Sequence, residues 1–191
     1  LYRYDANHSL YANVSGGLEA PAFNEVDPPP TLSGAKLNPF LAPMTSTTYE
    51  IGVKGIEVLE DEALIQSLSY SLAAYRIDIR NEIVPYSGGA YFFSAGESRR
   101  LGIEVGAQAF MPWDFSCAAS LTYMDARYVS YMNDAGDFKG NFVPGITELL
   151  FNARLQYLSS FGLMAELGVE HWGEYFADDA NTLKLPSAIT L

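Results

Sequence analysis

The sequence lacks the features on which several protein classes depend. Although 49% of its 191 residues are hydrophobic, no run reaches the ~18 apolar residues that a membrane-spanning helix needs. Cys117 is the single cysteine, so no internal disulfide bond can form. The chain has 11 Lys and Arg against 23 Asp and Glu, a net charge of −12. This shortage of cations argues against nucleic-acid binding, because phosphate contacts need positive charge.

Recognisable catalytic and metal-binding motifs are also missing. The two histidines, His8 and His171, stand far apart and cannot form a zinc-type cluster with one cysteine. No nucleophile elbow, phosphate loop or dinucleotide fingerprint occurs. Several acidic and amide side chains could offer oxygen ligands to Ca²⁺, but surface turns favour the same residue types. These are Asp134, Asp137, Asp178, Asp179 and Asn181. We therefore predict no enzyme activity, no cofactor and no resident metal.

What the sequence does contain is alternation of apolar and polar residues from end to end, which is typical of strands with two different faces. Between Glu148 and Tyr157 the odd positions are all apolar and the even positions are mostly polar. The predicted strands are 8–18, 46–56, 67–84, 91–110, 114–131, 148–158, 162–176 and an eighth that begins after 187. Near Ala74 the apolar phase shifts by one residue, which indicates either a β-bulge or a strand that leaves the membrane.

The connections between these strands alternate in length. Those near 57–66, 111–114 and 159–161 are short, while those near 19–45, 85–90, 132–147 and 177–186 are mostly longer and rich in Pro, Gly, Asp and Asn. Outer-membrane barrels show this asymmetry, with short periplasmic turns and long extracellular loops.

Strand length and aromatic placement point the same way. Several predicted strands exceed ten residues, whereas strands of soluble proteins average about 5–6 and membrane strands need about 9–11. Aromatic residues gather near the strand ends, as in an interfacial girdle. A soluble β-sandwich also alternates, but these features favour an all-β, antiparallel transmembrane β-barrel segment over residues 1–191.

Five segments, 9–23, 37–55, 74–84, 94–104 and 140–145, carry motifs that occur in one family in this order. They include GLEAPAF, NPFLAP followed by EIGVKG, YRIDIRNEIV, SAGESRRLGIE and GNFVPG. Together they resemble the C-terminal part of the barrel of TonB-dependent outer-membrane receptors. Three positions depart from the family pattern: Leu18 replaces Phe, Met44 replaces the Glu after Pro43, and Ser94 replaces Asn.

The resemblance implies about eight strands of a 22-stranded, plugged barrel in the bacterial outer membrane. It also implies active uptake of a bulky nutrient, above all an iron–siderophore complex. TonB would drive the uptake through a box on a plug outside this chain, and both ends of the chain look like cuts within a larger protein. The alternative is a passive porin, or a small structural or adhesive outer-membrane barrel, without a plug. Either protein would have membrane lipid as a partner.

Alternation also predicts which polar side chains face the lumen. They are Glu50, Lys54, Glu104, Gln108, Glu148, Asn152, Arg154, Gln156, Glu166, Glu170 and Glu174. Most of them would form a hydrated wall, because barrel interiors are polar by default. The candidate ligand contacts are the lumen charges Arg154 and Glu170 and aromatic residues near the outer mouth, which could stack on a ligand or belong to the girdle. The aromatic candidates are Phe92, Phe93, Tyr128, Tyr131 and Tyr175.

Overall fold

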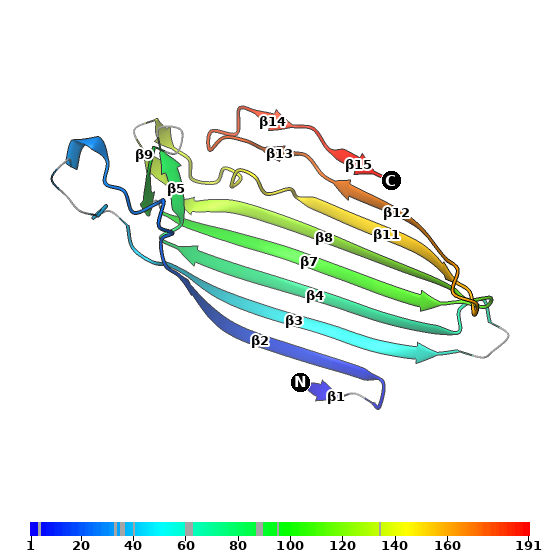
Figure 1. Ribbon diagram of the computed structural model, residues 1–191. Helices are drawn as coiled ribbons and strands as arrows, with labels where there is room; N and C mark the ends of the chain where they lie inside the picture. The colour runs from blue at the N-terminus through cyan, green and yellow to red at the C-terminus, as the bar shows by residue number, and fades with distance from the viewer. Residues whose placement is uncertain are drawn as a thin grey trace.

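The computed structural model describes residues 1–3, 5–32, 34, 37–39, 41–59, 63–86, 90–94, 96–133 and 135–191. Its main feature is one antiparallel sheet of nine strands in the order β1-β2-β3-β4-β7-β8-β11-β12-β15 (Figure 1). The strands are β1 (Tyr2–Arg3), β2 (His8–Glu19), β3 (Met44–Val58), β4 (Ser67–Arg80), β7 (Glu97–Phe110), β8 (Phe115–Ser130), β11 (Leu149–Leu158), β12 (Met164–Trp172) and β15 (Ala188–Thr190). The predicted all-β, antiparallel architecture is confirmed.

The long connections all lie at one end of the sheet, which we call the long-loop end (Figure 1). Three small hairpins belong to these connections. They pair β5 (Ile83–Tyr86) with β6 (Tyr91–Ser94), β9 (Met132–Asn133) with β10 (Gly136–Asp137), and β13 (Tyr175–Phe176) with β14 (Lys184–Leu185). The first long connection contains the 3-10 turn η1 (Pro30–Leu32). The opposite, short-turn end holds the turns at 111–114 and 159–163, close to the predicted 111–114 and 159–161. The predicted short connection 57–66 includes residues 60–62, which lie outside the described residues.

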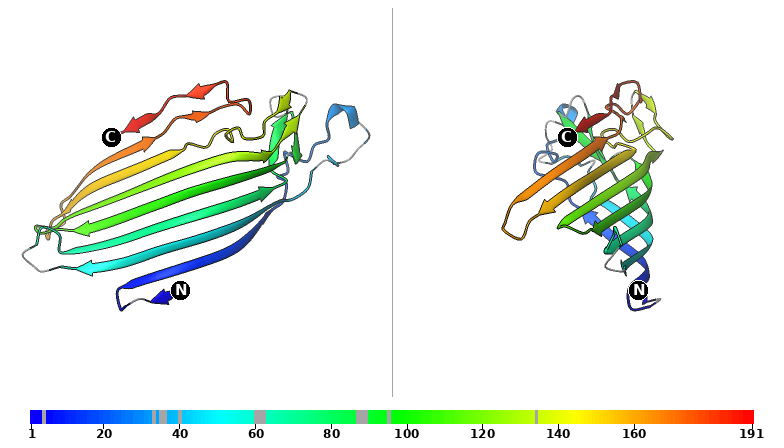
Figure 2. Two further views of the ribbon diagram at one scale, coloured as in Figure 1. Left: turned by 180° about the vertical axis from the view of Figure 1, so that it is seen from behind. Right: turned by 90° about the vertical axis from the view of Figure 1, so that its right-hand side faces the viewer.

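Residue register gives the sheet one apolar face and one polar face. Val53 lies opposite Leu10 and Leu72, and Leu155 lies opposite Cys117 and Leu167. The large apolar residues of this face remain substantially exposed, and Figure 2 shows the nine-stranded sheet as a twisted single layer, with no described element packed against its apolar face. We call the apolar face outward, because it needs lipid to cover it, and the polar face inward. None of the described helices has the length and apolar content to cross a membrane.

Three strands predicted as continuous are each two elements. Strand 67–84 ends at Arg80, where Asn81 adopts a φ of 56°, and β5 follows. Strand 91–110 is broken by Gly96, with a φ of 123°, into β6 and β7. Strand 162–176 is β12 followed by β13. Alternation could not reveal these breaks because the hairpins are themselves strands with two faces.

Ala74 carries no β-bulge. β4 pairs with β3 and with β7 without a shift along its whole length, and the register shift of this sheet lies between Glu97 and Ser98 of β7. The apolar outward positions of β4 nevertheless end at Ala74, because the next outward positions are Arg76, Asp78 and Arg80. The phase change therefore marks where β4 leaves its apolar surroundings.

Candidate functional site

A small buried cluster orders the connections at the long-loop end. We call it the loop core; it contains Val84, Ala126, Tyr128, Tyr131, Phe138 and Val143. The ring centroid of Tyr131 lies 4.7 Å from that of Tyr128 and 5.3 Å from that of Phe138. Because Tyr128 shares its strand face with the polar residue Ser120, the loop core lies on the inward side, over the end of β8.

Asp179 joins a second loop to the loop core. The Tyr128 hydroxyl donates to Oδ1 of Asp179 at 2.8 Å, and the Tyr131 hydroxyl lies 3.3 Å from Oδ2. Further along the same loop, Asn181 Oδ1 accepts from the Phe142 N–H at 2.7 Å, and Asn181 Nδ2 donates to the Phe142 carbonyl at 3.0 Å. The connections β8–β11 and β12–β15 therefore form one hydrogen-bonded unit.

The neighbouring Asp178 closes the β13–β14 connection. Its carboxylate accepts from the Leu183 N–H at 2.7 Å and from the Thr182 hydroxyl at 2.7 Å. The Leu183 hydrogen bond, followed by that from Thr182, lowers the pKa of Asp178. The carboxylates of Asp178 and Asp179 are thus engaged by protein groups, and in the described ranges no three His, Cys, Asp or Glu residues form a metal-binding group. Asp134, another residue considered for Ca²⁺, lies outside the described residues.

All five aromatic candidates lie at the long-loop end, but in different surroundings. Phe92 and Phe93 of β6 and Tyr175 of β13 are half-buried. Tyr128 and Tyr131 are only 4% and 3% exposed, so their rings offer almost no face to a ligand. Their position in the loop core depends on Asp179, which sequence spacing alone does not place near them.

The two charged candidates lie on the inward face. Arg154 and Glu170 are exposed and line one shallow pocket of about 340 Å³, to which β11, β12 and the end of β15 contribute. Asn152 pairs with Glu170 and Arg154 with Gly168, so the two charges are diagonal neighbours across the strands. Such an arrangement presents a cation and an anion together to whatever occupies the lumen.

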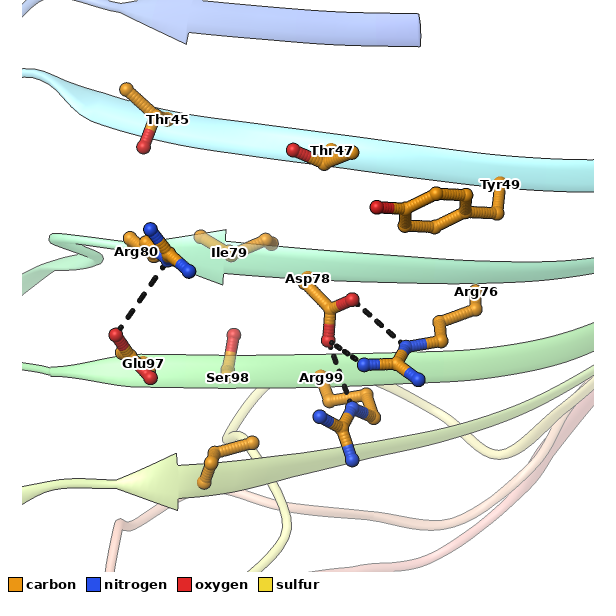
Figure 3. Close-up of a pocket in the computed structure, with 11 residues that line it drawn as sticks. Thr45, Thr47, Tyr49, Arg76, Asp78, Ile79, Arg80, Glu97, Ser98 and Arg99 are labelled. Carbon is orange, nitrogen blue, oxygen red and sulfur yellow. Dashed lines mark hydrogen bonds and ion pairs between the residues drawn. The ribbon is translucent and has the colours of Figure 1, made fainter. Parts of the chain in front are cut away.

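A third polar region lies on the outward face, where we predicted no candidate site. It lines a pocket of about 390 Å³ at the long-loop end of β3, β4 and β7 (Figure 3). Asp78 accepts from Arg76 Nε at 2.8 Å and from Arg99 Nε at 2.9 Å, and Arg80 Nε lies 3.7 Å from Glu97 Oε1. We call these five residues the outward arginine cluster.

The signal that could have revealed this cluster was the phase change near Ala74. On β4 it separates the apolar outward positions from Arg76, Asp78 and Arg80. The contribution of β7 was not visible, because Asp78 lies beside Arg99 only in the register that the folded sheet adopts.

The chain matches, over residues 1–191, the family model described as TonB dependent receptor-like, beta-barrel. The ferrioxamine receptor of Yersinia enterocolitica is 29% identical over 195 residues, which cover 98% of this chain and 24% of that protein. The ferrichrome outer membrane transporter/phage receptor of Escherichia coli strain K12 is 26% identical over 191 residues, covering 97% and 23%. The chain thus spans about a quarter of the length of these relatives.

Solved structures show the same fold. The ferric yersiniabactin uptake receptor of Yersinia pestis superposes with a TM-score of 0.73 at 19% identity, covering 99% of this chain and 27% of that one. A siderophore receptor of Acinetobacter baumannii gives a TM-score of 0.70 at 19% identity, covering 98% and 27%. At such identities the likeness shows the fold alone, here a section of a larger barrel.

Proposed function

This chain belongs to the TonB-dependent receptor-like β-barrel family of the bacterial outer membrane, and on that basis we propose a function for the full-length protein. Its full-length protein takes up a bulky nutrient by energised transport, and we assign that nutrient to the ferric siderophores. The observation that carries the assignment is the similarity, along nearly the whole chain, to a ferrioxamine receptor and a ferrichrome transporter.

The two faces and the two ends of the sheet support this proposal. The outward face suits lipid, and the inward face offers a polar wall to a solute. The long loops gather at one end, where the loop core and Asp179 join the β4–β7, β8–β11 and β12–β15 connections, as suits a surface that receives a ligand from outside. Energy coupling belongs to the proposal as well, with TonB acting on a plug that the family resemblance implies.

Among the candidate residues we assign direct ligand contact to those with accessible side chains. Arg154 and Glu170 serve a polar ligand on the inward wall, while Phe92, Phe93 and Tyr175 offer partly exposed rings at the rim. Tyr128 and Tyr131 act differently in this proposal, since they hold the loops in place from within the loop core.

Uptake of radioactive iron tests the proposal. Iron is supplied as ferrioxamine or as ferrichrome to three strains. The first is a deletion strain that carries the full-length gene, the second is the same strain with an empty vector, and the third carries the gene but lacks TonB. We expect uptake of at least one chelate only when both the gene and TonB are present. Uptake that persists without TonB would favour a passive porin, and uptake of no chelate would remove the siderophore assignment.

Arg154 offers a sharper version of the same experiment. Replacing it by Ala removes a charged hydrogen-bond donor, so the KM of uptake should rise about tenfold while the amount of receptor stays constant. Leu155→Ala is the matched control, because Leu155 is the next residue of β11 but lies on the outward face. If both variants transport alike, Arg154 does not contact the ligand.

A further inference from the structure

We propose that the outward arginine cluster binds the phosphate groups of a phosphorylated glycolipid in the outer leaflet of the outer membrane. The inference rests on the barrel's place in that membrane and does not depend on which nutrient the receptor transports. Its starting point is the set of five charged residues on the outward face, which is apolar nearer the middle of the same strands (Figure 3).

The position of the cluster matches the depth of lipid headgroups. On β4 the outward residues Leu72 and Ala74 precede Arg76, and on β7 the outward residue Leu101 follows Arg99. A strand rises about 3.3 Å per residue, so Arg76 lies only about 7 Å along the strand from Ala74. The arginines therefore stand directly beyond the apolar stretch, at the end of the sheet with the long loops. In an outer-membrane barrel this is the boundary between hydrocarbon and the outer headgroups.

The guanidinium groups retain donors for an anion. Contacts with Asp78 occupy Nε and one N–H of Nη2 in Arg76 and Nε in Arg99, whereas each guanidinium carries five N–H donors. The Arg76 and Arg99 side chains remain 47% and 41% exposed. Planar guanidinium forks match the oxygens of phosphate and can bind it bidentately.

The charged side chains in this region leave an excess of positive charge, which favours the binding of an anion. Three arginines share the two carboxylates of Asp78 and Glu97, although the whole chain has a net charge of −12. In addition, Arg99 lies directly opposite Arg127 of β8, and like charges at such positions repel. Asp125 accepts from Arg127 at 2.8 Å and offsets part of that repulsion. A phosphate bound over Arg76 and Arg99 would relieve more of it.

The third strand of the pocket adds groups suited to a sugar. Thr45, Thr47 and Tyr49 of β3 line the same pocket as the arginines, and their hydroxyls can exchange hydrogen bonds with a carbohydrate. Tyr49 is 48% exposed, and its ring offers an apolar face to a pyranose. A phosphorylated sugar headgroup joined to acyl chains satisfies the arginines, the hydroxyls and the apolar surface below them at once.

Native mass spectrometry of the full-length receptor in detergent tests the proposal. The probes are bisphosphorylated lipid A, the same lipid A after removal of both phosphates, and inorganic phosphate. We expect Arg76→Gln/Arg99→Gln to weaken binding of bisphosphorylated lipid A about thirtyfold, since each arginine near a charged membrane surface contributes about 1 kcal/mol. Arg3→Gln, the same change at the short-turn end, should bind like the wild type.

Asp78→Asn separates lipid binding from a purely structural ion pair. Removing the shared carboxylate frees both arginines, so phosphorylated lipid A should bind more tightly, opposite to the arginine variant. Weaker binding by Asp78→Asn, or equal binding of dephosphorylated lipid A, would overturn the proposal. Displacement of the lipid by inorganic phosphate would also overturn it, because the cluster would then bind free anions rather than lipid headgroups. Strand content measured by circular dichroism verifies that each variant is folded.

Discussion

The two ends of the sheet are ordered by different means. At the short-turn end, four residues join β7 to β8: the Met111 N–H donates to the Phe115 carbonyl at 2.9 Å, and Trp113 and Asp114 adopt positive φ angles of 61° and 63°. At the long-loop end, the connections are held by a buried aromatic cluster and by side-chain hydrogen bonds to Asp179. The β7–β8 turn is thus fixed by backbone geometry, whereas the long-loop end has its own small core.

We infer from this difference that the outer loops form a cooperative unit, which packs on the barrel wall through Ala126 and Tyr128 of β8. Their contacts join one loop to another, whereas the contacts of a short turn simply continue those of its two strands. Local units of this kind can open without global unfolding. A receptor built in this way can rearrange its ligand-facing surface while its wall stays closed.

Tyr128→Ala should have the largest effect, and it should act on the loops rather than on the barrel wall. It removes a 4% exposed ring from the loop core together with a hydrogen-bond donor to Asp179. Large-to-small changes of this kind lower the free energy of unfolding by about 3–5 kcal/mol, and here we expect the loops to be destabilised. Hydrogen exchange followed by mass spectrometry should show lost protection at 131–143 and 177–183 and unchanged protection in β3 and β4.

Tyr123→Ala is the control for that experiment. Tyr123 belongs to the same strand but faces outward and is 45% exposed, so its loss should leave exchange in the loops unchanged. If Tyr128→Ala instead raised exchange throughout the sheet, the loops and the wall would form a single cooperative unit.

Gly96→Ala should have the next largest effect, at the junction between a loop hairpin and the wall. Gly96 has a φ of 123°, and an added Cβ would collide with the backbone carbonyl oxygen of Ser130. Backbone strain and the collision together should lower the free energy of local unfolding by about 3 kcal/mol. The measurement is hydrogen exchange, which should increase at the start of β7. Gly140→Ala shares the positive φ, 86°, but its Cβ would meet no atom within 4 Å, so it should cost about 1 kcal/mol. Equal effects would exclude the collision as the cause.

The smallest expected effect is a pH dependence of the β13–β14 connection. Because its hydrogen bonds lower the pKa of Asp178 in the folded protein, the ionised carboxylate stabilises the connection above the unfolded pKa. That stabilisation should be lost as the pH falls below about 4. Protection factors for 177–185, corrected for intrinsic exchange, should decline over this interval in the wild type and stay low and constant in Asp178→Asn. A flat wild-type profile would contradict the assignment.

The sequence predicted the wall of this molecule better than its loops. Alternation reports which face a residue occupies, so the strands, the two faces and the alternating loop lengths were all accessible. The breaks at Asn81 and Gly96 were not, because the pattern continues through the hairpins beyond them.

The candidate site was harder to predict because its contacts join distant segments. Tyr128 and Asp179 are 51 residues apart in the sequence, and the residues around each of them do not predict the contact. The outward arginine cluster required the register between β4 and β7. A polar outward residue was visible in each strand, but the ion pair between Asp78 and Arg99 was not.

The unbroken pairing of β4 with both of its neighbours also limits how such a protein can evolve. A single-residue insertion near Ala74 would turn Arg76 and Asp78 into the lumen and push Ile77 and Ile79 toward the lipid. An insertion of two residues would preserve every orientation. Descendants of this sheet should therefore gain or lose strand residues in pairs, while their outer loops are free to vary by any number.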